Sequence, residues 1–154
     1  MKTKCIFFLA LISVLTSCDK NSVYSKLDKN FENNRWQSDD VKTFEFTLEE
    51  ASKTYNLELQ FTHIYDYQYE SVPLDIQLTH PDGKVETIPF ALKIKDASGK
   101  QLADCTGDMC DLFVPLKENI TLNKGTYKLS VAQSFQKPYL PNVLALGVTV
   151  KAVP

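Results

Sequence analysis

The sequence predicts an all-β fold, an antiparallel β-sandwich with jelly-roll-like topology that follows an N-terminal lipoprotein signal and a tether. Three observations support this prediction. Apolar and polar residues alternate with period two in several short segments, turn-forming residues separate these segments, and no long amphipathic helix is apparent. An immunoglobulin-like sandwich is the alternative topology, because alternation predicts strands but does not determine their order.

The clearest alternation lies in the first half of the chain. Residues 43–48, 55–62 and 74–79 each place apolar side chains at every second position, which predicts half-buried strands with one face in water. The run 81–84 contains Pro, Asp and Gly and predicts a turn. It would join the third of these strands to a further strand over 85–94 in a hairpin.

The second half of the chain carries less regular strand patterns. Pro89 lies inside the run 85–94 and predicts an edge strand or a bulge, because proline lacks the backbone donor that a central strand needs. A second turn is expected at 96–100, and further strands at 112–116, 126–132 and 143–150. A total of about eight or nine short strands is typical of a sandwich.

The N-terminus has the pattern of an export signal. A short basic stretch, 1–4, precedes eleven largely apolar residues at 5–15. A helix of that length measures roughly 16 Å, which is too short to cross a hydrocarbon core of about 30 Å. The pattern therefore predicts a cleaved signal peptide over 1–17.

The signal ends in a tetrad that resembles the lipobox of bacterial lipoproteins, formed by Leu15, Thr16, Ser17 and Cys18. Small residues give the peptidase access to the bond before Cys18, whose thiol would receive the diacylglycerol. Two or three acyl chains anchor a protein stably, so the predicted partner of Cys18 is the cell membrane or outer membrane, on the exported periplasmic or surface side. The alternative is an ordinary signal peptide with a chance cysteine.

The remaining length suits a tether and one domain. Residues 18–35 are mostly polar and are predicted to form a lipidated tether, with a short helix at 23–31 as an option because apolar residues there fall at helical spacing. Trp36 is predicted to begin the β-sandwich domain, 36–154, as a core or edge anchor.

The charge balance excludes a nucleic-acid partner. The chain of 154 residues has 17 Lys and Arg against 19 Asp and Glu, a net charge of −2. Residues 1–17 hold two lysines and no acid, so their removal leaves 15 against 19 and a net charge of −4. A nucleic-acid-binding surface needs an excess of basic side chains to contact phosphates.

Two cysteines remain in the predicted domain, Cys105 and Cys110. An even pair in an oxidising compartment predicts a disulfide that closes a short loop. Two free thiols or a metal-binding pair are the alternatives. A zinc site would need further ligands, and His63 and His80 lie far away in the sequence.

The sequence lacks the common patterns of catalysis and cofactor binding. It contains no glycine-rich phosphate loop, no paired-histidine zinc motif and no nucleophile elbow. His63 and His80 are each predicted at a strand end on the surface, and Asp104, Asp108 and Asp111 form only a weak calcium pattern. The prediction is a protein without enzymatic activity, cofactor or metal site.

One segment has the composition of a binding surface. Tyr65, Tyr67 and Tyr69 alternate with polar residues between two predicted strands, and loop tyrosines offer rigid contact area with a polar tip. These three are predicted to form a partner-binding edge, joined by Tyr139 from the aromatic and proline-containing run 137–143. The alternative is that they close one end of the sandwich.

Several short motifs follow one another in order over residues 18–151. They are Cys18 of the lipobox, Trp36, Phe44-Glu45-Phe46, Tyr55-Asn56-Leu57, Tyr67-Gln68-Tyr69-Glu70-Ser71, Pro81-Asp82-Gly83-Lys84, Ala97-Ser98-Gly99-Lys100, Gly107-Asp108, Gly125-Thr126-Tyr127, Ala132-Gln133, Leu140-Pro141-Asn142-Val143 and Leu146-Gly147-Val148. Their order and spacing resemble the gliding motility lipoprotein family GldH of the Bacteroidetes. The chain departs from the family's Tyr-Pro-Tyr-like stretch at Gln68, and its Cys105 and Cys110 do not resemble family features.

The resemblance implies a non-enzymatic, membrane-anchored lipoprotein of the gliding motility apparatus, a process linked to type IX secretion. It implies other envelope proteins of the gliding machinery as partners, and no catalytic residues. A lipid-anchored β-sandwich that binds glycan at the cell envelope is the alternative function. A hydrolase is the third hypothesis.

Overall fold

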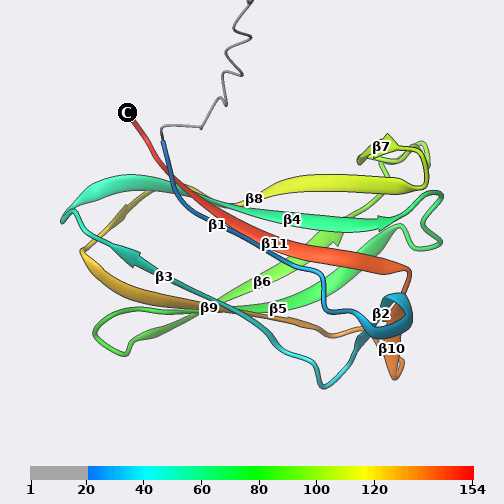
Figure 1. Cartoon of the computed structure of the whole chain (residues 1–154), viewed down its shortest axis with the longest axis horizontal. Helices are drawn as coiled ribbons and strands as arrows, with labels where there is room; N and C mark the ends of the chain where they lie inside the picture. The colour runs from blue at the N-terminus through cyan, green and yellow to red at the C-terminus, as the bar shows by residue number, and fades with distance from the viewer. Residues whose placement is uncertain (1–20) are drawn as a thin grey trace, which may run out of the picture.

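The computed structural model describes residues 21–154, which form eleven strands and one short 3₁₀ helix (Figure 1). The strands are β1 (Ser22–Asp28), β2 (Arg35–Gln37), β3 (Lys42–Leu48), β4 (Lys53–Ile64), β5 (Ser71–Thr79), β6 (Val85–Lys93), β7 (Asp104–Thr106), β8 (Met109–Leu122), β9 (Gly125–Gln133), β10 (Tyr139–Pro141) and β11 (Val143–Ala152), and the helix is η1 (Glu32–Asn34). The predicted all-β class is confirmed.

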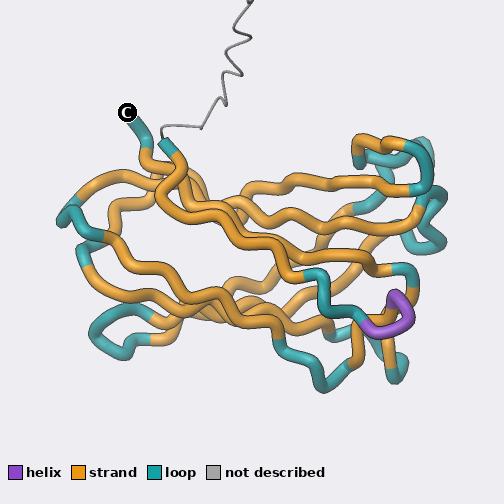
Figure 2. The backbone as a smooth tube through the Cα atoms, in the orientation of Figure 1, coloured by secondary structure: helices purple, strands orange, loops and turns teal. Residues whose placement is uncertain are grey.

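The strands form two antiparallel sheets that pack face to face, and a separate two-stranded ribbon (Figure 2). The strand orders are β1-β11-β4-β8-β7 in one sheet, β3-β9-β5-β6 in the other, and β10-β2 in the ribbon. When the eight longest strands are numbered along the chain, the two sheets read 1-8-3-6 and 2-7-4-5. This is the strand order of a jelly roll, so the predicted topology is confirmed over the immunoglobulin-like alternative.

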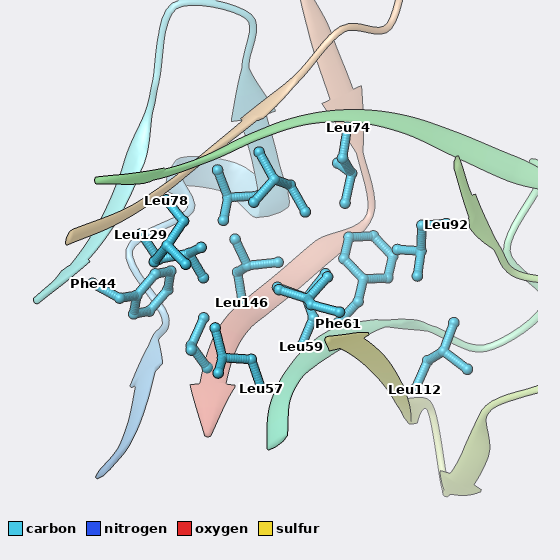
Figure 3. Close-up of a cluster of buried hydrophobic side chains, with 14 of the residues drawn as sticks. Phe44, Leu57, Leu59, Phe61, Leu74, Leu78, Leu92, Leu112, Leu129 and Leu146 are labelled. Carbon is cyan, nitrogen blue, oxygen red and sulfur yellow. The ribbon is translucent and has the colours of Figure 1, made fainter. Parts of the chain in front are cut away.

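The core lies between the two sheets and consists of the apolar members of the alternating segments. In β3 and β5, buried and exposed side chains alternate along the strand. Figure 3 shows part of this core, including Phe44, Leu57, Leu59, Phe61, Leu74, Leu78, Leu92, Leu112, Leu129 and Leu146. Full burial of one such side chain contributes roughly 1.5–3 kcal/mol, so the alternation determines which face of each strand turns inward.

The folded domain begins earlier than the sequence predicts. Residues 22–28, expected in the tether 18–35, form β1 and pair antiparallel with β11. Phe31 is buried and lies edge-on to Trp36, with ring centroids 5.9 Å apart. The prediction of a tether is therefore wrong for residues 21–35, and so is the prediction of an optional helix at 23–31. An edge strand is held by backbone hydrogen bonds to its neighbour, so its polar composition does not mark it as unfolded.

A glycine in β11 makes room for β1. Leu27 of β1 pairs with Gly147, and its side chain lies over that residue. A Cβ added to Gly147 would stand 2.8 Å from Leu27 Cδ1 and 3.3 Å from Gln60 Cβ. A side chain at this position would therefore make Leu27 shift away from its place on the sheet.

The predicted signal and anchor lie outside the described part of the chain. Residues 1–17 and Cys18 are not among the described residues, so the lipobox stays a prediction. Across the range 21–154, no helix has the length and apolar character needed to span a bilayer.

Two local predictions for the hairpin of β5 and β6 are confirmed. The His80 N–H donates to the Lys84 carbonyl at 2.8 Å, and Gly83 adopts a positive φ of 85°. Pro89 lies in β6, the outermost strand of its sheet, where a missing donor leaves no central ladder incomplete.

The sandwich has two ends that differ in construction (Figure 1). The terminal end carries Asn21, the C-terminal residues 152–154 and the turns 49–52, 80–84 and 123–124. The aromatic end carries the ribbon, the loops 29–34, 65–70, 94–103 and 134–138, and the turn between β7 and β8. The 12 residues of β4 run from one end to the other, so the ends are about 36 Å apart.

Candidate binding site at the aromatic end

A groove at the aromatic end is lined by tyrosine and proline side chains. Its volume is about 230 Å³, and its lining residues are Tyr69, Lys137, Pro138, Tyr139 and Pro141. Tyr69 comes from the loop between β4 and β5, and the other four come from β10 and the loop before it. The structure therefore brings together two of the aromatic residues that the sequence predicts to act jointly.

Tyr67 lies in the core and not at the predicted binding edge. Its side chain is fully buried, and its hydroxyl donates a hydrogen bond to the Pro141 carbonyl at 3.0 Å. Its ring lies 4.8 Å from that of His63 and 5.8 Å from that of Phe61, centroid to centroid. Burial raises the pKa of the Tyr67 hydroxyl, which keeps it a neutral donor. The expected exposed edge is therefore wrong at Tyr67, because this residue fills the open end of the sandwich.

The flanking tyrosines face different surroundings. Tyr65 is 60% exposed but does not line the groove, and its backbone N–H donates to the Asp108 carbonyl at 2.9 Å. Tyr69 is half-buried, with its ring 4.6 Å from that of Phe135 and edge-on to that of Tyr67 at 5.8 Å. Aromatic neighbours thus hold the Tyr69 ring in place while part of it borders the groove.

The ribbon of β2 and β10 positions Tyr139. This residue pairs with Gln37 across the ribbon, and the Arg35 guanidinium lies 4.5 Å from the centre of the Tyr139 ring. Such a cation–π contact contributes roughly 0.5–1 kcal/mol at an exposed site. The next residue, Leu140, is fully buried and fixes the strand to the core.

Trp36 anchors the ribbon to the core. The sequence predicts this residue as a core or edge anchor. Its side chain is fully buried, and its indole Nε1 donates to the Asp40 carbonyl at 2.7 Å. The Trp36 carbonyl accepts a hydrogen bond from Gln133 Nε2 at 3.5 Å. These contacts give Tyr139 a rigid base.

Asn142 joins the two walls of the groove. Its backbone has a φ of 61°, a left-handed conformation that asparagine adopts more readily than most residues. Its carbonyl accepts the Ile64 N–H at 3.1 Å, and its side-chain amide donates to Gln68 Oε1 at 3.2 Å. The loop 65–70 is thereby tied to the segment that carries Tyr139.

A disulfide closes the hairpin beside this loop. Cys105 of β7 and Cys110 of β8 face each other in register and are bonded, which confirms the predicted disulfide over free thiols or a metal pair. Gly107 turns the chain with a φ of 61°, and the carbonyl of the following Asp108 accepts the Tyr65 N–H. The crosslinked hairpin therefore supports the start of the loop 65–70.

His63 is buried beneath the site, and its predicted surface position is wrong. Its Nδ1 lies 2.9 Å from the Ile64 carbonyl, so a neutral ring donates there, while Nε2 has no hydrogen-bond partner among the described residues. Burial lowers the pKa of His63 because the charged ring would lose its hydration. The alternation over 55–62 would have placed His63 inside if it had been extended by one residue.

The other polar residues singled out in the sequence lie at opposite ends of the sandwich: Asp104, Asp108 and Asp111 belong to the β7–β8 hairpin, and His80 does not. His80 lies at the terminal end, with Nε2 3.5 Å from a carboxylate oxygen of Glu86. Asp111 accepts hydrogen bonds from Thr62 Oγ1 at 2.6 Å and Gln60 Nε2 at 3.0 Å. Within residues 21–154, no three His, Cys, Asp or Glu side chains gather in a way that could hold a metal ion.

Comparison with known proteins places this chain in a family. A family model described as GldH lipoprotein matches residues 22–150. The gliding motility lipoprotein GldH homolog of Christiangramia forsetii is 28% identical over 131 residues, which cover 84% of this chain and 79% of that protein. The gliding motility lipoprotein GldH of Flavobacterium johnsoniae is 28% identical over 153 residues, which cover 97% and 92%.

Solved structures resemble the chain more distantly. The Eiger TNF of S. frugiperda has a TM-score of 0.35 and 13% identity, over 68% of this chain and 62% of that one. The family match, by contrast, extends from β1 to β11 and includes both walls of the groove. The chain therefore belongs to the GldH lipoprotein family.

Proposed function

We propose that this chain is a non-enzymatic lipoprotein of the gliding motility apparatus, in a process linked to type IX secretion. Family membership and the names of the two relatives support this proposal. Cleavage after residue 17 would leave Cys18 to carry the acyl chains, in the cell membrane or the outer membrane on the exported side. The domain that follows acts as a binding module next to that membrane.

The groove between Tyr69 and Tyr139 is the observation that carries the binding role. Its aromatic rings are held by Phe135 on one side and by Arg35 on the other. Prolines complete the lining, and proline has no side-chain rotamers to lose. A surface that is already ordered gives up little entropy when a partner binds, and tyrosine is among the residue types that dominate binding energy.

The charges beside the groove indicate the chemistry of the partner. Arg35 stacks on Tyr139, and Lys137 Nζ lies 5.9 Å from the centre of the Phe135 ring. Lys137 lines the groove, and Arg35 lies against Tyr139, which is one of its lining residues. We therefore expect an envelope protein of the gliding machinery that inserts an apolar or proline side chain and places a carboxylate near Lys137 or Arg35.

A Tyr139→Ala variant tests this site, with Phe113→Ala as the matched control. Phe113 is an aromatic residue with 51% exposure on β8, outside the groove. In affinity isolation from native membranes, Tyr139→Ala should lower recovery of the partner about tenfold or more. Stability should stay within about 1 kcal/mol of wild type. Equal recovery by both variants would remove the groove from the proposal.

Glycan binding is the second candidate function, and the amide side chains beside the groove favour it. Gln68 and Asn142 are hydrogen-bonded to each other next to the segment with Tyr139, and sugar sites combine aromatic faces with such amides. Binding of purified envelope polysaccharide that Tyr139→Ala abolishes and Phe113→Ala preserves, without any protein recovered from membranes, would favour this alternative.

A further inference from the structure

We propose that the terminal end of the sandwich faces the bilayer that holds the Cys18 acyl chains, and that the aromatic groove is displayed at the opposite end. The inference rests on the proposed acylation of Cys18. It goes beyond the proposed function because it assigns a lipid-facing surface and an orientation to the domain.

The short connection between Cys18 and the sheet carries this inference. The Asn21 carbonyl accepts a hydrogen bond from the Ala152 N–H at 2.8 Å, so the chain is held by the sheet from Asn21 onward. Only Asp19 and Lys20 lie between Asn21 and Cys18. Three residue steps span at most about 11 Å in any conformation. The terminal end therefore stays within that distance of the acylated residue.

The exposed side chains of the terminal end suit uncharged lipid headgroups. Acids and bases balance there, with Glu49, Glu50 and Asp82 in the turns against Lys84 and Lys124 in the turns and Lys53 at the start of β4. A polybasic surface would gain about 1 kcal/mol per basic residue from anionic lipids, and this end has no such excess. The acyl chains, and not surface charge, therefore determine which end faces the bilayer.

The flank formed by the β3-β9-β5-β6 sheet favours water. Its outward side chains include Thr43, Glu45, Asp75 and Gln77, which are all exposed. Burial of such a face against lipid would remove hydration without compensating hydrogen bonds. With this flank in water and the terminal end at the bilayer, β4 holds the groove about 36 Å further out.

The outer face of the other sheet is the competing lipid-facing surface. Phe113 and Met109 are 51% and 52% exposed along β8. If this face lay on the bilayer, the two ends of the sandwich would be at similar distances from the membrane surface. An experiment that compares the two ends therefore separates the two orientations.

Two exposed alanines provide matched label positions, one at each end. Ala51 lies in the turn before β4, and Ala97 lies in the loop between β6 and β7. The mature acylated lipoprotein, which begins at Cys18, would be labelled with a fluorophore as Ala51→Cys or Ala97→Cys and reconstituted into phosphatidylcholine vesicles. Because Cys105 and Cys110 are bonded to each other, labelling leaves them intact. The quencher is a nitroxide on the lipid headgroup.

We expect the label at position 51 to lose most of its emission and the label at position 97 to keep nearly all of it. Partial replacement of phosphatidylcholine by phosphatidylglycerol should leave both results unchanged. Similar quenching at both positions, stronger quenching at position 97, or no quenching at either while the protein floats with the vesicles would each overturn the orientation. Flotation of a Cys18→Ala chain to the same extent as wild type would instead refute the acylation on which the proposed function depends.

Discussion

The two ends of the sandwich close the same jelly roll by different means. At the terminal end the turns are short and their hydrogen bonds are local, as between the Gly83 N–H and the His80 carbonyl at 2.9 Å. At the aromatic end the loops are longer, and bonds such as that from the Tyr67 hydroxyl to the Pro141 carbonyl join segments far apart in the sequence. The rigidity of the proposed binding surface thus depends on buried groups that would never touch a partner.

Neighbouring residues of one loop show the same contrast on a smaller scale. Tyr67 is fully buried and hydrogen-bonded, whereas Tyr69, two positions later, borders the groove. Tyr67 therefore holds the loop in place so that Tyr69 can be presented. Variants that affect only one of these roles test whether the buried residues of the aromatic end support the groove.

The largest effect is expected from removal of the buried ring at the aromatic end. Tyr67→Ala should lower the free energy of unfolding by about 3–5 kcal/mol, because it leaves a cavity beside His63 and Phe61. Tyr67→Phe removes only the hydroxyl and should cost about 1–2 kcal/mol, since the Pro141 carbonyl loses its donor. Denaturant unfolding measures the free energy of unfolding of both variants. If Tyr67→Ala were as stable as wild type, the core role assigned to Tyr67 would be wrong.

The next effect concerns the hairpin that supports the loop 65–70. The double variant Cys105→Ala/Cys110→Ala should be about 2 kcal/mol less stable, because the unfolded chain is freed from a closed loop of about six residues. Partner recovery should fall as well, since Tyr65 is held by the Asp108 carbonyl in this hairpin. A reductant should lower the stability of wild type and leave the double variant unchanged. A response of the double variant to reductant would point to another cause.

A smaller and purely local effect is expected at the terminal end. Gly83 has a φ of 85° and open space around its Cβ position, so Gly83→Ala adds backbone strain without a clash and should cost about 1 kcal/mol. Because the turn is local and lies far from the groove, partner recovery should equal that of wild type. Loss of recovery at unchanged protein level would show that the two ends are coupled.

The smallest effect at neutral pH belongs to His63. Burial holds its pKa below the ordinary value of 6.5, so the unfolded chain binds a proton before the folded one as the pH falls. The stability that this group contributes is complete above about pH 6.5 and declines below it, until His63 is protonated in the folded protein as well. His63→Gln should show a shallower fall of melting temperature below pH 6.5 than wild type. Parallel curves would assign the acid sensitivity to other groups.

Much of the fold could be predicted because its signals are local. The alternation in β3 and β5 identified strands and their inward faces, and the run 81–84 identified a hairpin turn. The short spacing of Cys105 and Cys110 was enough to predict their bond. β1 escaped prediction because a polar edge strand is defined by its partner β11, which lies at the other end of the chain.

The candidate site was predicted only in part. Tyr69 and Tyr139 do line one groove, but Tyr67 is core and Tyr65 stands outside the lining. The residue types indicated which segments contribute to the site, but the sequence did not show which of the tyrosine side chains point toward the groove. In a loop no strand period tells which side chain turns inward, so the distinction depends on the packing of Phe61, His63 and the segment around Pro141.

By itself the sequence determined the features that depend on neighbours along the chain: strand periodicity, turn chemistry, the spacing of the cysteines and the predicted lipobox at Cys18. Only the tertiary structure decided the strand order, the burial of Tyr67 and His63, and the meeting of Tyr69 with Tyr139. The physical reason is that a jelly roll pairs strands that are distant in sequence. Its ends are then closed by side chains whose environment comes from several segments at once.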